Sequence, residues 1–286
     1  MILLTGATGT VGGHLLSTLA AQGAPVRALV RSQERADSLR GYDCEITIGS
    51  YEDPDSLDHA LRRVDRVFLV TAGGPDLAAQ ELAMVRAIRA AATSPHVVKV
   101  AAAGVDAAEP WTRIQREHLR VTQALAEAEV PTTVLAPGVF FQNLLRSVAG
   151  MRERGVISAP AGDTPLTWVD ARDIAAVAAH VLTSDGHEGA TYTVTGPEQL
   201  PYAELARRLS AATGLDVRYE DVAPERFRAD LVAAGTPEWN ADALVELYEG
   251  YRAGRGPAVT DEVTKATGRD AATLEDFLTH HMAAFR

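Results

Sequence analysis

Three glycines near the start of the chain have the spacing of a phosphate-binding turn. Gly6, Gly9 and Gly12 follow the apolar run 2–5 and precede a helical pattern of apolar residues that starts at Val11. A tight turn between a strand and a helix needs glycine, because a side chain would keep a dinucleotide pyrophosphate away from the backbone. The free N–H groups and the dipole at the helix start then attract the anion. The spacing Gly-x-x-Gly-x-x-Gly predicts a variant of the dinucleotide-binding motif, and the alternative is a turn that needs glycine for packing alone.

The next strand ends in an arginine that bears on the choice of cofactor. Arg31 and Ser32 follow the apolar run 26–30, about 20 residues after the glycine turn. A carboxylate at this place would bind the ribose 2′-hydroxyl of NAD, whereas an arginine suits the 2′-phosphate of NADP. Arg31, with Arg35 one helical turn further on, therefore predicts NADP(H) as the cofactor. The alternative is a solvated arginine at a strand end.

The order of apolar runs and helical patterns predicts an α/β fold. Ligands of a parallel sheet bind outside the carboxyl ends of its strands, so we expect cofactor contacts there. The predicted strands are 2–5, 26–30, 44–49, 66–71, 97–102 and 132–136, with helices between them that include 77–92 and 113–129. The expected cofactor-binding residues are Gly6, Thr8, Gly9, Thr10, Val11, Gly12, Arg31, Ser32, Ser50, Thr71, Ala72, Gly73, Ala101, Ala102, Pro137 and Gly138.

Strands that alternate with helices in this way indicate a Rossmann-type, doubly wound parallel sheet. We expect residues 1–138 to form this core, with part of 166–195 returning to it. Short strands are predicted at 166–169 and 192–195. Residues 139–286 are expected to form mostly a smaller, helix-rich C-terminal lobe that binds the substrate. Its helices are predicted at 202–212, 224–234, 237–251 and 274–285.

Composition narrows the possible partners. The net charge of −11 and the presence of only two lysines argue against a nucleic-acid surface, which needs clustered cations. The single cysteine, Cys44, excludes an internal disulfide and a cysteine-based zinc site. Asp170 and Asp173 have the spacing of a helix cap and a first-turn acid, so we expect no metal. No basic leader follows Met1 and no apolar run reaches about 18 residues, which predicts a cytoplasmic protein without a membrane partner.

Several motifs together resemble the NmrA-like branch of the atypical short-chain dehydrogenase/reductase superfamily. They are the turn 6–12, Arg31, Glu117-His118, Pro137-Gly138 with Asn143, the segment 169–175, and the tail 263–269 with Asp276-Phe277. The likeness covers nearly the whole chain. Members of that branch include NADPH-dependent quinone oxidoreductases, reductases of ergot alkaloid pathways, and redox-sensing regulators that bind NADP without turning it over.

The resemblance also shows what this chain lacks. Classical members of the superfamily use Tyr-x-x-x-Lys, and those two places fall at Ile114 and His118. Alanines 101–103 stand where a serine usually follows the fifth strand. Quinones, enones and iminium ions accept a hydride without a tyrosine acid, provided the pocket orients them.

The candidates for chemistry and substrate binding are few. His118 is the best candidate for a proton donor or ribose ligand, because the ordinary histidine pKa suits general acid catalysis, and the alternative is a structural role. Phe140, Phe141, Asn143 and Trp168 are expected to line the substrate pocket, and the alternative is that the aromatic rings belong to the core.

We therefore predict an NADPH-dependent reductase of a small conjugated or aromatic electrophile in secondary metabolism, a monomer or homodimer whose partner is a small molecule. Two alternatives stay open, a non-catalytic NADP-binding redox sensor and a non-redox isomerase or cyclase.

Overall fold

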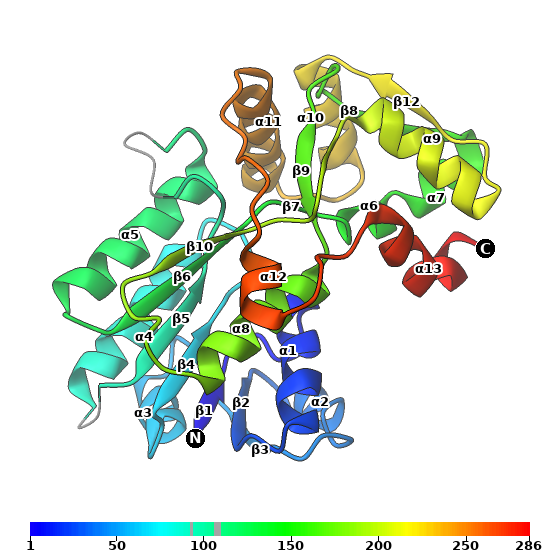
Figure 1. The fold of residues 1–286 in the computed structure, drawn as a ribbon. Coiled ribbons are helices and arrows are strands. Elements are labelled where there is room, and N and C mark those ends of the chain that lie inside the picture. The colour runs from blue at the N-terminus through cyan, green and yellow to red at the C-terminus, as the bar shows by residue number, and fades with distance from the viewer. Residues whose placement is uncertain (92–93, 106–109) are drawn as a thin grey trace.

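The computed structural model describes residues 1–91, 94–105 and 110–286, and its centre is a seven-stranded parallel sheet (Figure 1). In spatial order the strands are β10 (Thr191–Val194), β6 (Thr132–Pro137), β5 (His96–Val100), β4 (Arg66–Leu69), β1 (Ile2–Leu4), β2 (Val26–Val30) and β3 (Glu45–Ile48). The chain starts in the middle at β1, winds outwards to β3, and then returns to build the other half from β4. The predicted doubly wound α/β fold is confirmed, and it places the carboxyl ends of all seven strands along one edge.

Two layers of helices cover the sheet. On one face, apolar residues of α1 (Thr10–Ala21), α8 (Ala171–Thr183) and α12 (Glu262–Thr267) share one hydrophobic core. On the other face, α3 (Pro54–Leu61), α4 (Leu77–Ala90) and α5 (Arg113–Glu127) form a second core. The short helix α2 (Gln33–Asp37) packs beside β2 and β3. The inner strands β1, β4 and β5 are therefore buried from both sides, as their apolar sequences require, whereas the edge strand β3 is mostly exposed.

Local sequence signals account for the helix starts. Asp53 caps α3, whose first residue is Pro54. Thr112 and Gln115 form a capping box at the start of α5, with side chain and backbone bonded reciprocally. Asp170 accepts a hydrogen bond from the Arg172 N–H at the start of α8, as the sequence predicts.

The rest of the chain forms a C-terminal lobe with its own core, in the upper half of Figure 1. Its elements are β7 (Val139–Phe140), α6 (Asn143–Arg146), α7 (Val148–Arg154), β8 (Val156–Ala159), β9 (Leu166–Val169), β11 (Gln199–Leu200), α9 (Tyr202–Thr213), β12 (Arg218–Asp221), α10 (Pro224–Ala233), α11 (Glu238–Arg252) and α13 (Leu274–Phe285). Stacked aromatic rings fill this core: Phe141 lies against both Trp168 and Phe277, at centroid distances of 5.7 and 5.4 Å.

The lobe differs from the predicted helical lobe in two ways. It contains two small sheets, β11-β9-β7 and the parallel pair β12-β8. The prediction lacks these sheets because runs such as 156–159 are too short for periodicity to reveal them. The short helix α12, also absent from the prediction, packs on α8 in the sheet layers. The predicted helix 77–92 is observed to Ala90, and its expected last residue, Ala92, lies outside the described residues. A division at residue 138 stays a prediction.

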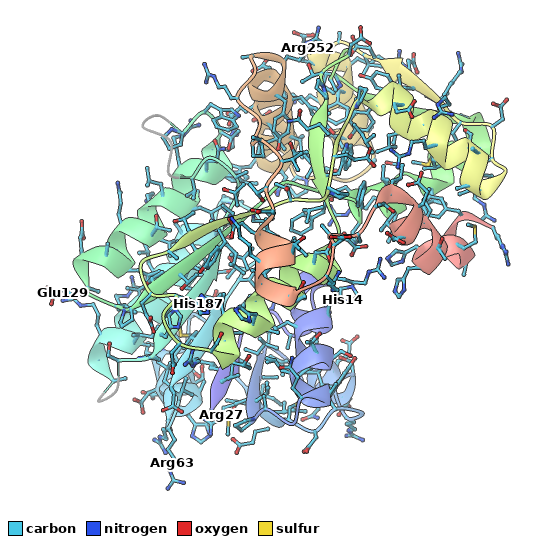
Figure 2. The ribbon with its side chains drawn as sticks, in the orientation of Figure 1. His14, Arg27, Arg63, Glu129, His187 and Arg252 are labelled. Carbon is cyan, nitrogen blue, oxygen red and sulfur yellow. The ribbon has the colours of Figure 1, made fainter. Side chains whose placement is uncertain are left out.

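Two labelled arginines, Arg27 and Arg252, lie towards opposite ends of the molecule in Figure 2. Arg27, in the lower part of the view, donates to the carbonyls of Ala60 and Arg62 and pairs with Glu45. Arg252 lies at the top, in the C-terminal lobe.

Among the helices that the structure describes, none is both long and apolar enough to cross a membrane.

Replacing Phe277 tests the aromatic core of the lobe. The ring is fully buried against Phe141, so Phe277→Ala leaves a cavity and is expected to lower the free energy of unfolding by about 3–5 kcal/mol. Tyr42→Ala removes an aromatic ring that is 39% exposed and should change it by about 0.5 kcal/mol or less. Urea unfolding followed by circular dichroism measures both. Equal effects of the two substitutions would contradict the packing described here.

Candidate functional site

The glycine turn after β1 leaves no room for side chains. Gly6 has φ +64°, in the left-handed region, and its carbonyl oxygen accepts the Gly9 N–H at 2.8 Å. A Cβ on Gly12 would lie 2.1 Å from that same oxygen. The first turn of α1 therefore sits directly on the turn backbone, which only glycine permits.

The N-terminus of α1 is open to an anion. Its N-cap, Gly9, has no side chain to accept from the first N–H groups, and the first turn contains no acidic residue. Side chains cap α3, α5, α8 and α13, whereas α4, α9 and α11 also start without a side-chain cap, so the glycine turn is what distinguishes α1. An uncapped start with a close glycine approach fits a pyrophosphate, which would accept from these N–H groups.

Arginines lie beside this turn, at the carboxyl end of β2. Arg31 is exposed immediately after the strand, and Ser32 accepts from the Arg35 N–H as the N-cap of α2. The Arg35 guanidinium lies 3.5 Å from the hydroxyl of Thr8, across the glycine turn. The fold thus brings together the two parts of the predicted cofactor site, which are 27 residues apart.

The loop after β4 contacts the C-terminal lobe and so lies between this lobe and the central sheet. Ala72 and Gly73, which the sequence predicts to contact the cofactor, are exposed there. The Gly73 carbonyl accepts from the Asn240 side chain of α11 at 2.8 Å, and a Cβ on Gly73 would lie 3.3 Å from Ile114. The C-terminal lobe therefore closes over this edge of the sheet.

A cluster of charged and polar side chains is buried beneath that edge. Lys99 on β5 and Glu81 on α4 are both completely buried, with Lys99 Nζ 2.9 Å from Glu81 Oε2. The same Nζ lies 2.9 Å from His118 Nδ1 on α5 and donates to the Val100 carbonyl. The other carboxylate oxygen, Glu81 Oε1, accepts from Thr71 at 3.1 Å. The cluster joins two helices to the ends of β4 and β5.

Burial decides the protonation of this cluster. Desolvation lowers the pKa of Lys99 and raises that of Glu81, while their mutual attraction opposes both shifts. Burial, together with the nearby Lys99 charge, lowers the pKa of His118 well below its ordinary value. At neutral pH the imidazole is neutral. The premise that His118 has an ordinary pKa suited to general acid catalysis is therefore wrong, because the ring is buried beside a cation.

Sequence reasoning missed Glu81 and Lys99, although signals were present. Lys99 interrupts an otherwise apolar strand, 97–100, and Glu81 lies on the apolar face of α4 with Leu77, Ala78 and Met84. A charge inside a buried strand needs a buried partner. The sequence does not say which of 38 acidic residues supplies it.

The remaining expected cofactor residues lie at strand ends. Ser50 bonds to Ser56 through its backbone, next to the start of α3. Ala101 and Pro137 are buried, and Ala102 is half-buried. A Cβ on Gly138 would lie 2.3 Å from the Thr167 carbonyl, so this glycine admits β9 to the edge of the sheet. Their contact with a cofactor stays a prediction.

The residues expected in the substrate pocket separate into two groups. Phe141 and Trp168 are each 1% exposed in the core of the lobe, and the Trp168 indole donates to the Leu200 carbonyl. Asn143 is exposed at the start of α6, and Phe140 is half-buried in β7. Only this second pair has surface available for a ligand.

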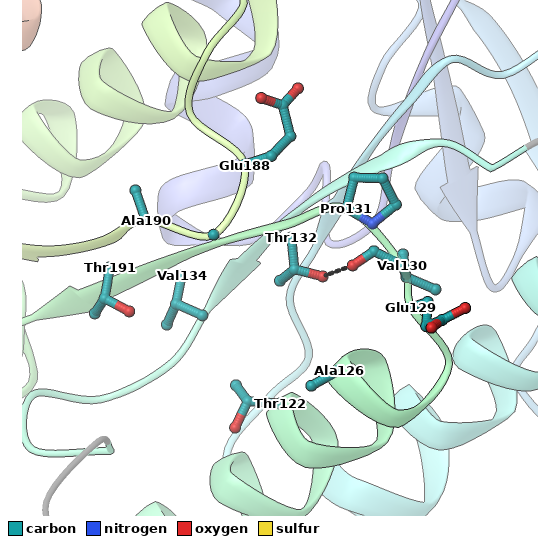
Figure 3. A pocket seen from close by; sticks show the side chains of 11 residues that line it. Thr122, Ala126, Glu129, Val130, Pro131, Thr132, Val134, Glu188, Ala190 and Thr191 are labelled. Atoms are coloured by element: carbon teal, nitrogen blue, oxygen red, sulfur yellow. Dashed lines mark hydrogen bonds between the residues drawn. The ribbon is translucent and has the colours of Figure 1, made fainter.

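An open hollow of the described structure lies elsewhere. It has a volume of about 710 Å³ and lies between α5 and the amino ends of β6 and β10, as Figure 3 shows. Glu129 and Glu188 line it, and Thr132 donates to the Val130 carbonyl. This hollow is at the opposite end of the strands from the glycine turn. Within the described ranges, no group of three or more metal-ligating side chains is placed to hold an ion.

Known proteins and one protein family match this chain over nearly its whole length. The model of the NmrA-like family matches residues 1–278. The chain is 39% identical to the NAD(P)H azoreductase of Xenophilus azovorans, covering 100% of this chain and 99% of that protein. It is 40% identical to the (4-alkanoyl-5-oxo-2,5-dihydrofuran-3-yl)methyl phosphate reductase of Streptomyces griseus, with the same coverage.

Solved structures match over the same length. The NADPH-dependent quinone oxidoreductase of Escherichia coli, complexed with NADPH, has a TM-score of 0.89 and 27% identity, over 98% of this chain and 99% of that chain. The triphenylmethane reductase of Citrobacter sp., complexed with NADP(H), has a TM-score of 0.86 and 27% identity, over 98% and 99%.

Two adjacent glycines of α1 provide a matched test of the turn. A Cβ on Gly12 collides with the Gly6 carbonyl, whereas one on Gly13 meets nothing closer than 3.7 Å. Gly12→Ala is expected to destabilise the protein by about 1–3 kcal/mol or more. Gly13→Ala should stabilise it by about 0.5–1 kcal/mol, because alanine favours the helix. Thermal and urea unfolding measure the difference, and a neutral Gly12→Ala would contradict the close approach.

Proposed function

Because the chain belongs to the NmrA-like family, we propose that it is an NADPH-dependent reductase of small conjugated or aromatic electrophiles. The observation that carries the proposal is the open N-terminus of α1 on a glycine turn that admits no Cβ, beside an exposed arginine. We also propose that the protein acts in secondary metabolism, as its resemblance to the family implies.

The residues around the turn suit NADPH in kind and position. The N–H groups at the start of α1 would hold the pyrophosphate, and Arg31, with Arg35, would hold the 2′-phosphate. When bound, NADPH supplies a hydride at its nicotinamide ring. The ring would lie towards the loop after β4, where Gly73 and Ile114 leave a small, apolar edge.

The side chains at this edge limit the chemistry. Ile114 stands in the place of the classical tyrosine, and it can neither donate nor accept a proton. His118, one turn further along α5, is neutral and buried. The site therefore suits a substrate whose own unsaturated system accepts the hydride and then takes a proton from water.

The names of the relatives describe substrates of that kind. An azo group, a quinone and an acyl-substituted dihydrofuranone each contain an electron-poor double bond. These compounds are named as substrates of the related proteins. They support the choice of a conjugated electrophile for this chain without selecting one.

Turnover of a substrate panel tests the function. With NADPH, the purified protein is expected to reduce at least one quinone, azo dye or acyl-butenolide, with loss of absorbance at the NADPH band. Tight NADPH binding without turnover of any class would overturn the proposal in favour of a redox sensor. Conversion of a substrate without NADPH oxidation would favour an isomerase or cyclase.

Replacing Arg31 tests the choice of cofactor. A guanidinium-phosphate contact contributes about 1.5–3 kcal/mol, so Arg31→Ala should weaken NADPH binding about ten- to a hundredfold. NADH affinity should stay nearly constant, because NADH lacks the phosphate. Arg40→Ala, which removes an exposed arginine paired with Asp37, is the control and should change neither affinity. Calorimetric titration measures both cofactors, and equal weakening of the two by Arg31→Ala would contradict the assignment.

A further inference from the structure

We propose that the buried pair Lys99 and Glu81 positions His118, holding its imidazole as the neutral tautomer with the proton on Nε2, so that this N–H is the hydrogen-bond donor offered to the bound cofactor or substrate. The inference deepens the proposed function and rests on it for the ligand. The tautomer itself depends only on the contacts of the three side chains.

The surroundings of Lys99 require the ammonium to be a donor. An ammonium group has three hydrogens and no lone pair. Three electronegative neighbours surround it: the Val100 carbonyl, Glu81 Oε2 and His118 Nδ1. The carboxylate contact has the distance of an ion pair without the alignment of a hydrogen bond. The Glu81 carboxylate, with Oε2 at 2.9 Å, opposes the effect of burial on the pKa of Lys99 and so favours the protonated lysine.

A donating Lys99 decides which nitrogen of His118 carries the proton. Nδ1 lies 2.9 Å from Nζ, so it must present its lone pair to the ammonium. A second proton on Nδ1 would place two donors face to face, and the imidazolium charge would lie beside the lysine charge. The neutral ring therefore has its proton on Nε2, and the assignment follows from the hydrogen-bond partners rather than from observed hydrogens.

The place of His118 on α5 directs this donor to the candidate site. Ile114 and His118 are four residues apart and share one face of the helix. Ile114 lies against Gly73 in the loop after β4, and His118 lies one turn further along α5 than Ile114. His118 retains 8% of its surface, whereas Lys99 and Glu81 are completely buried. Of the three, only His118 has surface left for a ligand.

The arrangement gives the pair a positioning role. Lys99 stands on β5, and the α5 position that classical relatives fill with lysine is His118 here. The cation of this chain is Lys99, which contacts the buried side of His118 and orients its imidazole without touching a ligand. Glu81 neutralises the ammonium, and Thr71 in turn donates to Glu81, so the carboxylate is held in place from the end of β4.

Nuclear magnetic resonance of ¹⁵N-labelled histidine tests the tautomer without any substrate. The wild-type spectrum should show His118 neutral and protonated on Nε2, with its signal identified by its loss in His118→Gln. The double variant Lys99→Met with Glu81→Leu removes both buried charges together, which avoids leaving one of them unpaired. In it, the His118 signal should shift to mixed tautomers.

A rescue and a control make the test specific. Lys99→Gln with Glu81→Gln keeps an N–H donor for Nδ1 without charge, and should restore the Nε2–H tautomer. Lys265→Met removes the only other lysine, which pairs with Asp261 on the surface, and should leave the His118 signal unchanged. A wild-type ring protonated on Nδ1, or one unaffected by the Met/Leu double variant, would overturn the inference.

Ligand measurements then identify what accepts the N–H. If the cofactor accepts, the Met/Leu variant should bind NADPH about three- to tenfold more weakly, the value of one hydrogen bond. If the substrate accepts, NADPH binding is kept and kcat/KM falls by a similar factor. Loss of the tautomer with neither change would overturn the role of the donor. A confirmed tautomer in a protein that reduces no substrate would leave the positioning intact and refute the proposed function alone.

Discussion

A fully buried ammonium group has to be compensated inside the protein, and the compensation of Lys99 joins elements from three parts of the chain. Glu81 comes from α4, His118 from α5 and the Val100 carbonyl from β5 itself. Removing two charges from water costs several kcal/mol per ion, which their attraction offsets only in good geometry. The positions of α4 and α5 over the sheet are therefore restricted by more than apolar packing.

A second restriction acts at the glycine turn. Thr5 bonds to the backbone of Phe68 and Val70, which ties the end of β1 to the end of β4. Gly6 and Gly12 then let α1 start directly on that junction. The open helix start and the loop at Gly73 consequently lie at one edge of one sheet, and the buried cluster lies directly beneath that edge.

The C-terminal lobe is attached to this edge by charged side chains. Arg113, the first residue of α5, bonds to Glu246 and Asp242 of α11, and Asp242 also pairs with Arg228. Partly exposed ion pairs stabilise little singly, but a network with several hydrogen bonds also selects an orientation. Trp111 packs against Gly250 of the same helix, where a Cβ would meet the indole at 1.8 Å. The lobe thus holds its position over the candidate substrate site through the same helix that carries His118.

The sequence by itself determined the class of fold and the cofactor edge. The alternation of strands and helices, the glycine turn and the Asp170 cap depend on local signals, because each is a matter of neighbouring residues and periodicity. Tertiary structure decided what the side chains do. Whether Trp168 and Phe141 face a ligand or a core depends on the rings that stack on them from other elements, and Phe277, which stacks on Phe141, lies more than 100 residues further along the chain. The character of His118 depends on Lys99 and Glu81, which are far from it in sequence, and a histidine pKa follows burial and neighbouring charge rather than the residues beside it in the chain.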